Sequence, residues 1–302
     1  MLTRRLVPAL LVALVGCGGG DAQNRCKGLT SAACADPPGG GALLETLVVD
    51  VAWLEDHLGD PDVQLIDTRA SGYELARIPG AIPLRPEDLA TEVDGIPAQI
   101  KPSTEAASVL REAGLRNEVI AVVYGDAPEY DASRVVWSLS YFRHGDVRYL
   151  DGGYSAWVDA GGELETSPPE ASQSAYTVIG VDDTLSVTGD WVLAQLGVDS
   201  FDMPPLQLVD ARSETEYGDG RIPTARNVDW RDNLSRGFLL SKPELDTRYR
   251  GLDPDETTVT YCVTGWRGSF AWLTLTALGY EDVRLYDGSW NEWGAGNFPV
   301  EQ

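Results

Sequence analysis

The sequence predicts an α/β protein built from two similar domains, each an open and mainly parallel sheet flanked by helices. Three observations lead to this prediction. A chain of 302 residues is longer than one ordinary domain. It contains an internal duplication, and each half alternates short apolar runs with helical patterns. The hydrophobic fraction of 43% is that of a globular protein.

The duplication consists of four landmarks that occur in the same order in both halves. They are a strand ending in Asp-x-Arg, an Arg-Ile-Pro turn, an apolar strand, and a Val-Arg strand followed by Asp-Gly and a tryptophan. Because chance is a poor explanation for four ordered matches, the halves are interpreted as copies of one unit. The matched segments are 63–69 with 206–212, 77–81 with 221–225, 119–124 with 257–261, and 147–157 with 283–293.

The predicted secondary structure follows from the patterns within each copy. The apolar runs are short, rich in β-branched residues and not strictly alternating, as expected for strands buried on both faces. In the second half, Phe270, Leu273 and Leu278 fall near helical spacing, and Gly279 is a favourable helix stop. The segment 135–142 is the corresponding helix of the first half. Strands alternating with helices predict a parallel sheet in each domain.

The domain boundaries are placed by the duplication and by a polar, proline-containing linker around 161–175. The expected segments are a signal at 1–17, a tether and small loop at 18–44, a first domain at 45–162, a linker at 163–180 and a second domain at 181–302.

The N-terminus has the form of an export signal. Two arginines precede an apolar stretch that is too short to span a bilayer, and 14–17 reads Leu-Val-Gly-Cys. This ending resembles a bacterial lipobox, so Cys17 is expected to carry lipid and the glycines after it to form a tether. An ordinary signal peptide that contains a cysteine is the alternative. The protein is therefore expected in a bacterial cell envelope, held to a membrane by this anchor.

Two further cysteines, Cys26 and Cys34, lie close together before the first domain. In an oxidising compartment they are expected to form a disulfide, with two free thiols as the alternative. Cys262 is then left unpaired, and an unpaired cysteine in an exported protein calls for a functional explanation.

The charge balance restricts the partners. A formal charge of −24 excludes nucleic acid, because nucleic-acid binding requires a basic face. The acidity favours solubility, and we expect a monomer. An anionic substrate would need a local positive site in so acidic a chain.

Cys262 is the predicted nucleophile. It follows a predicted parallel strand, at the sheet edge where open α/β proteins bind ligands, and the chain then enters a helix. Unpaired N–H groups at that helix start and the charge of Arg267 favour a thiolate over a thiol. Gly265 allows a tight turn around the sulfur. A buried structural cysteine is the alternative. The expected residues around a sulfur or oxyanion are Val263, Thr264, Gly265, Trp266 and Arg267.

Four residues near the predicted site have two interpretations. Asp210 and Arg212 are expected to form an ion pair that supports the strand end, because the same pair recurs in the first half, where the loop has no cysteine. Alternatively, Arg212 or Arg221 faces the pocket. Trp266 either lines the substrate entrance or is an exposed aromatic residue of the loop.

These motifs together resemble the tandem-domain rhodaneses, the group that contains thiosulfate and 3-mercaptopyruvate sulfurtransferases. The resemblance runs from about 47 to 301 and is particularly close over 287–294. It implies two rhodanese-like domains, a first domain that has lost its cysteine, with Asp126 in that place, and a catalytic second domain. It also implies a relay in which Cys262 takes sulfur from a small donor as a persulfide and passes it to a thiol or cyanide.

No metal or other cofactor is implied. The two histidines, His57 and His144, lie far apart in the sequence and are expected at the surface.

The Cys262 loop departs from both main types of this family. Thiosulfate-type enzymes resemble Cys-Arg-Lys-Gly-Val-Thr and mercaptopyruvate-type enzymes Cys-Gly-Ser-Gly-Val-Thr, whereas this loop reads Cys-Val-Thr-Gly-Trp-Arg. It is similar to the Cys-x-x-Gly-x-Arg loops of single-domain rhodaneses, with Arg267 as the compensating cation. The donor is therefore left open. Two other functions remain: a rhodanese-like phosphatase or arsenate reductase, whose loop is one residue longer, and an envelope sulfur-carrier or binding module.

Overall fold

The computed structural model describes residues 43–44, 46–126, 130–167, 173–196 and 206–302, all within the compact unit Asp36–Gln302. The predicted export signal, the predicted lipidation site Cys17 and the predicted disulfide between Cys26 and Cys34 lie outside the described residues. Within the described ranges, no helix has the length and apolar character that crossing a bilayer requires.

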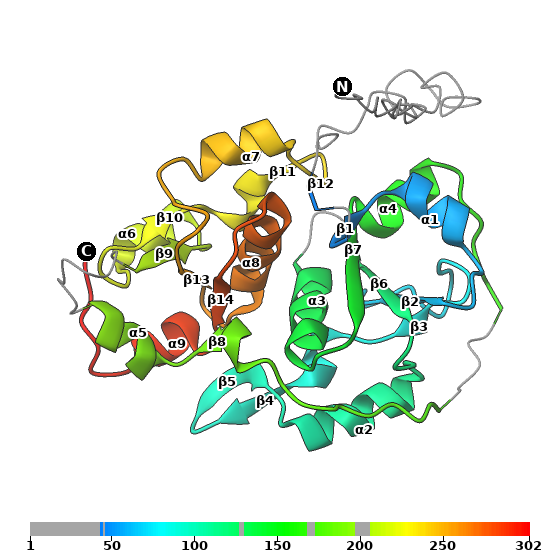
Figure 1. Ribbon diagram of the computed structural model, residues 1–302, viewed down its shortest axis with the longest axis horizontal. Coiled ribbons are helices and arrows are strands. Elements are labelled where there is room, and N and C mark those ends of the chain that lie inside the picture. Colours follow the sequence, from blue (N-terminus) through cyan, green and yellow to red (C-terminus); the bar gives the residue numbers. More distant parts are fainter. Residues whose placement is uncertain (1–42, 45, 127–129, 168–172, 197–205) are drawn as a thin grey trace, which may run out of the picture. The chain divides into compact units, whose positions relative to one another are not determined.

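The first half forms a five-stranded sheet in which all neighbouring strands are parallel (Figure 1). Central strands are apolar on both faces because helices cover the sheet on each side. The strands, in sheet order, are β1 (Val48–Val49), β7 (Asp146–Leu150), β6 (Ile120–Tyr124), β2 (Val63–Asp67) and β3 (Ile82–Pro83). The helices are α1 (Val51–His57), α2 (Ser103–Ala113), α3 (Asp131–Tyr141) and α4 (Gly153–Asp159), with a 3₁₀ turn η1 (Pro86–Leu89).

The second half repeats this sheet, again with parallel neighbours throughout. In sheet order its strands are β8 (Ser186–Val187), β14 (Val283–Tyr286), β13 (Thr258–Tyr261), β9 (Gln207–Asp210) and β10 (Arg226–Asn227). Its helices are α5 (Gly189–Leu196), α6 (Glu214–Asp219), α7 (Lys242–Arg248), α8 (Trp266–Leu278) and α9 (Ser289–Trp293), with 3₁₀ turns η2 (Asp183–Leu185) and η3 (Trp230–Asn233). Strand for strand the two orders are the same, which confirms the predicted duplicated α/β fold.

Two antiparallel hairpins add to the sheets, one in each half. The first consists of β4 (Ala90–Val93) and β5 (Ile96–Ile100), and the second of β11 (Leu234–Ser235) and β12 (Phe238–Leu239). Helix α8 ends at Gly279, whose φ of 96° is left-handed, so the predicted helix stop is confirmed.

The halves share one hydrophobic core. Helices α3 and α8, which are copies of each other, run side by side, and a single buried cluster takes residues from both halves (Figure 1). Ser133 Oγ and Ser269 Oγ meet at 3.2 Å between these helices. The rings of Tyr149 and Phe270 pack edge to face with centroids 6.2 Å apart. Because apolar burial is continuous across this contact, the two halves stabilise one another.

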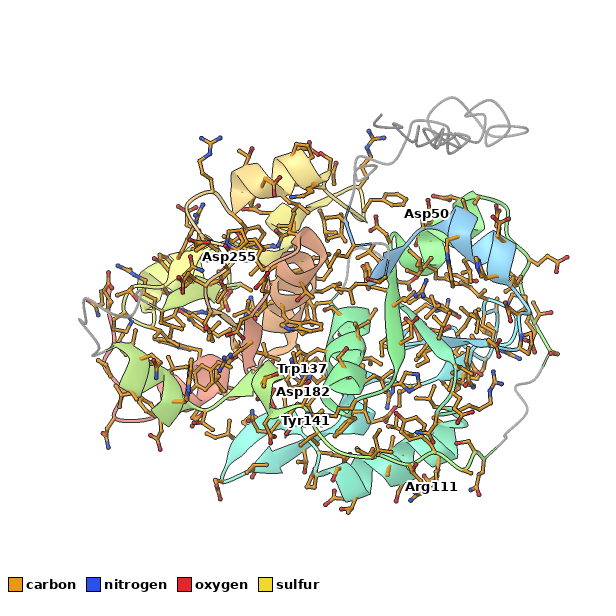
Figure 2. All side chains as sticks on the ribbon, in the orientation of Figure 1. Asp50, Arg111, Trp137, Tyr141, Asp182 and Asp255 are labelled. Carbon is orange, nitrogen blue, oxygen red and sulfur yellow. The ribbon has the colours of Figure 1, made fainter. Side chains whose placement is uncertain are left out.

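The segment that joins the halves is docked on the first half. Asp182 N donates to Tyr141 O at 2.7 Å, close to Trp137 on the same helix, α3 (Figure 2). Arg111 Nη1 donates to Tyr176 O at 3.2 Å. These two contacts fix the path of the connection along α3 and α2.

His144 corrects one expectation. It was predicted at the surface, but its ring is buried and stacks on Tyr176 with centroids 5.8 Å apart. One ring nitrogen lies 3.1 Å from the Tyr176 hydroxyl and the other 3.0 Å from Val119 O. Burial lowers the pKa of His144, so the neutral ring is favoured and both its nitrogens are satisfied. His57 is half-buried and stacks on Trp53. In the described part of the chain, no cluster of side chains could hold a metal ion.

Asp151 gives the fold a pH dependence that can be measured. It follows β7, and loss of hydration raises its pKa from 3.8 to about 7. The folded protein therefore keeps the Asp151 proton at pH values where the unfolded chain loses it, so stability falls as pH rises from about 4 through 7. We expect a loss on the order of 1 kcal/mol, because partial exposure weakens the effect. Thermal melts of wild type and Asp151→Asn across this range check it, and equal slopes would contradict it.

Candidate active site

Cys262 lies at the carboxyl end of β13, between β9 and β14 in its sheet. It is a free thiol, and only 1% of the residue is exposed. Its backbone N–H donates to Ser289 Oγ at 3.1 Å, and its carbonyl accepts from Trp290 N at 3.0 Å. The sulfur therefore sits in a fixed backbone frame at the edge where parallel sheets bind ligands.

The loop after Cys262 turns directly into α8. Gly265 is the N-cap residue, with a left-handed φ of 82°. A Cβ atom at this position would lie 2.9 Å from Asp287 Oδ1 and 3.0 Å from Asp287 O. Glycine is thus needed for both its conformation and its size. The start of a 13-residue helix then directs unpaired N–H groups toward the loop.

The segment 287–291 holds the Cys262 loop from the other side. Ser289 Oγ accepts from Cys262 N and donates to Tyr286 O at 2.8 Å, so one hydroxyl joins the ends of two strands. Asn291 N donates to Val263 O at 3.0 Å. Ser289 was not among the site residues predicted from the sequence. The repeated Asp-Gly landmark was the signal, but it does not show which strand the hydroxyl reaches.

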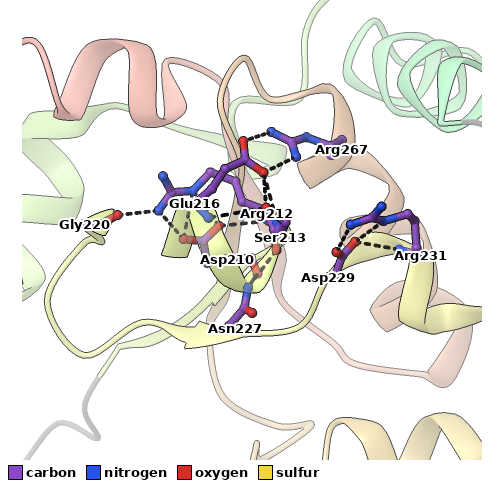
Figure 3. A network of polar contacts seen from close by, with 9 residues as sticks. All are labelled: Asp210, Arg212, Ser213, Glu216, Gly220, Asn227, Asp229, Arg231 and Arg267. Carbon is purple, nitrogen blue, oxygen red and sulfur yellow. Dashed lines mark hydrogen bonds and ion pairs between the residues drawn. The ribbon is translucent and has the colours of Figure 1, made fainter. Parts of the chain in front are cut away.

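Arg267 forms a bidentate ion pair with Glu216. Its Nη1 and Nη2 each lie 2.8 Å from a Glu216 oxygen, and Glu216 also accepts from the Ser213 hydroxyl at 2.7 Å (Figure 3). The hydrogen bond from Arg267 is the main cause that lowers the pKa of Glu216 to about 2. Contacts with Glu216 and then with Cys262 raise the pKa of Arg267. The charge of Arg267 is thus influenced by both Glu216 and Cys262.

Glu216 was not among the site residues predicted from the sequence, and it changes the expected charge of the loop. Arg267 was expected to add a full positive charge, but a carboxylate largely neutralises it. The only local signal was a capping box in which Ser213 and Glu216 begin α6. That motif explains the start of the helix and does not reveal that both carboxylate oxygens also accept from Arg267.

The ion pair predicted between Asp210 and Arg212 is present and buried. Arg212 Nη2 lies 2.6 Å from Asp210 Oδ2 and 2.7 Å from Gly220 O, and its guanidinium stacks over Trp290. The same arrangement occurs in the first half, where Arg69 bonds Asp67. Its recurrence there is consistent with a structural role at the strand end.

Arg221 and Trp266 are the remaining residues that were considered for the substrate pocket. The guanidinium of Arg221 pairs with Glu301 and lies over the Tyr217 ring, 4.7 Å from its centroid. Trp266 is half-buried, as are Val263 and Thr264. Within the described residues, the Trp266 indole nitrogen is buried without a hydrogen-bond partner.

The fold and this site define a class of protein. Two copies of a parallel α/β unit are joined, and one copy presents a cysteine at a strand end, next to a helix N-terminus and a paired arginine. The family described as "Rhodanese-like domain" matches residues 50–160 and 190–295. The chain belongs to the rhodanese family, as a member with two tandem domains.

Individual relatives agree with this assignment over most of their length. A putative thiosulfate sulfurtransferase SseA of Mycobacterium leprae is 31% identical, covering 80% of this chain and 86% of the relative. A thiosulfate sulfurtransferase of Corynebacterium glutamicum is 30% identical, covering 82% and 87%. The solved structure of SseA from Escherichia coli, described among 3-mercaptopyruvate sulfotransferases, matches with a TM-score of 0.72 and 26% identity, covering 81% and 99%. The chain is thus a sulfurtransferase of this family.

Proposed function

We propose that Cys262 carries sulfane sulfur from a small anionic donor, such as thiosulfate or 3-mercaptopyruvate, to a thiol or cyanide. With thiosulfate, the Cys262 thiolate attacks the outer sulfur, a new S–S bond forms, and sulfite leaves with the electron pair of the broken bond. An acceptor thiolate or cyanide then attacks the terminal sulfur and releases the Cys262 thiolate. The observation that carries this proposal is the position of Cys262 at the end of β13, in the short loop that opens α8 and leads to Arg267.

The N–H groups at the start of α8 are suited to hold the charge on the terminal sulfur. A persulfide anion extends beyond Cys262, toward the turn formed by 263–267, where these donors are unpaired. Because the Glu216 carboxylate balances the charge of Arg267, most of the stabilisation of the persulfide anion would come from the backbone N–H groups and not from charged side chains. This is a site for one small anion in an otherwise acidic chain.

The proposal is tested by the intact mass of the described domains after incubation with thiosulfate and, separately, with 3-mercaptopyruvate. Wild type is expected to gain the mass of one sulfur atom and lose it on addition of cyanide, whereas Cys262→Ser gains none. The donor that loads the enzyme is thereby identified. No gain with either donor, although the thiol can still be titrated, would contradict the proposal. Release of phosphate from an aryl phosphate without sulfur transfer would instead favour the phosphatase function.

A sulfur-carrier function is the second candidate, and the low exposure of Cys262 favours it. A carrier would accept sulfur once and release it slowly to small molecules, because delivery would require a protein partner. Repeated turnover with cyanide at saturating donor separates the two functions. Several turnovers per minute support an enzyme that acts on small molecules, whereas a single turnover supports a carrier.

We also propose that Cys17 is lipidated and that the protein faces the outside of a bacterial membrane. The lipobox-like sequence at 14–17 and the short apolar stretch before it support this location. Expression with a labelled fatty acid is expected to label the full chain and not a Cys17→Ala variant. Equal labelling of both would contradict the anchor.

A further inference from the structure

Each half has a hairpin that contacts the other half, and the two contacts are arranged pseudo-symmetrically. In each half, the Asp of the fourth landmark accepts a hydrogen bond from a hairpin strand of the other half. Ile100 N, in β5, donates to Asp287 Oδ2 at 2.8 Å, and Leu239 N, in β12, donates to Asp151 Oδ1 at 2.9 Å. One of these contacts adjoins the Cys262 loop and the other adjoins the loop of the first half, which has no cysteine.

Among the described residues, only the contact next to Cys262 includes a buried ion pair. Arg134, on α3 of the first half, is 1% exposed, and its Nη1 donates to Asp287 Oδ1 at 2.7 Å. Its Nη2 donates to Ala98 O at 3.2 Å, in the same hairpin that reaches Asp287. Since Ser133 and Ser269 meet as related positions, the residue related to Arg134 is Phe270, which is apolar. The duplication has therefore been modified on one side.

This ion pair touches the turn that positions the nucleophile. A Cβ atom on Gly265 would lie 2.9 Å from Asp287 Oδ1 and 3.2 Å from Arg134 Nη1, so both charged groups pack against the turn. Asp287 also begins the segment 287–291, whose backbone and Ser289 hydroxyl hold Cys262. A shift of Asp287 would be transmitted to the sulfur by both routes.

We propose that Arg134, supplied by the repeat that has no cysteine, is a positioning residue for Cys262. It acts through Asp287, and its role in sulfur transfer rests on the proposed function of Cys262. The guanidinium fixes the Asp287 carboxylate between the β5 hairpin and Gly265, which keeps the turn closed around the sulfur. Small misplacements of a reacting group lower rates strongly, so a residue remote from the sulfur can govern its reactivity.

The test compares Arg134→Met, Arg134→Lys and Asp287→Asn with the matched control Asp151→Asn. The rate at which Cys262 reacts with methyl methanethiosulfonate is measured from pH 6 to pH 9, together with loading by thiosulfate and the melting temperature. This reagent is small and uncharged and requires no sulfur-transfer activity, so failure of the proposed function would leave this measurement intact. If Arg134→Met does not fold, Arg134→Lys and Asp287→Asn provide the comparison.

Arg134→Met and Asp287→Asn are each expected to slow the reaction of Cys262 about 10-fold, with partial recovery in Arg134→Lys. Asp151→Asn is expected to react like wild type, because it alters the related contact at the other loop. The two test variants change local charge in opposite directions, so a shared decrease indicates position and not electrostatics. Rate changes of opposite sign, or a lower melting temperature with unchanged reactivity, would overturn the proposal. So would a wild-type Cys262 that does not react.

Discussion

Replacing Gly265 by Ala is expected to slow persulfide formation at least about 100-fold in a protein that remains folded. The left-handed φ of 82° costs an L-residue about 1–2 kcal/mol. The larger effect is steric, because the new Cβ would lie 2.9 Å from Asp287 Oδ1 and 3.0 Å from Asp287 O. Neither oxygen can retreat freely, since Asp287 is held by Arg134 and Ile100. The turn must therefore open and displace Cys262.

Gly279→Ala is the control for this variant. Gly279 closes the same helix, α8, with a φ of 96°, and a Cβ there would meet no atom within 4 Å. It imposes the same backbone penalty at a position remote from the turn. Both variants are expected to lower the melting temperature by a few degrees. Only Gly265→Ala is expected to load sulfur more slowly, as measured by rapid quench followed by intact mass. Comparable rates in the two variants would show that the turn is not constrained as described.

Replacing Arg267 by Gln is expected to slow the reaction of Cys262 with thiosulfate about 10- to 100-fold at neutral pH. Loss of the guanidinium leaves the negative charge of the Glu216 carboxylate uncompensated beside the Cys262 loop, which repels an anionic donor. Glu216→Gln is expected to speed the reaction of Cys262 with thiosulfate, which carries two negative charges. The substitution removes a negative charge from the site and leaves the guanidinium in place. Single-turnover loading with thiosulfate and with 3-mercaptopyruvate measures both changes, and thiosulfate should gain more.

Arg231→Gln provides the matched control. Arg231 also forms a bidentate ion pair, with Asp229, but the Arg231 side chain is 61% exposed (Figure 3). Loss of this exposed pair is expected to leave sulfur loading within a factor of two. If Arg231→Gln slowed loading as much as Arg267→Gln, the effect of Arg267 would be one of general surface charge.

The fold was predictable because its signals are local and repeated. Each landmark strand, the helix that ends at Gly279 and the Asp-x-Arg ion pairs lie within a few residues of the motif that indicates them. The same holds for Cys262, whose strand, loop and helix are contiguous. The prediction that His144 lies at the surface was wrong for the opposite reason, because its burial depends on Tyr176 and Val119, which are distant in the sequence.

The missed parts of the site are all long-range. Glu216 reaches Arg267 only because α6 and the Cys262 loop both begin at the carboxyl edge of the sheet, and Ser289 reaches Cys262 from the segment after the neighbouring strand, β14. Arg134 comes from the other half of the chain and bonds Asp287. Composition and spacing describe residues that are close along the chain. They do not indicate contacts between distant segments that the fold brings together.

The meeting of Ser133 and Ser269 has an evolutionary consequence. In an isologous dimer, residue i of one subunit contacts residue j of the other and j contacts i, and a residue on the twofold axis meets its own copy. The two serines and the reciprocal hairpin contacts keep this geometry within a single chain. In a homodimer every substitution alters both subunits at once. In a single chain each half can change alone, so one half can lack the thiol and supply an arginine, Arg134, that serves the other half.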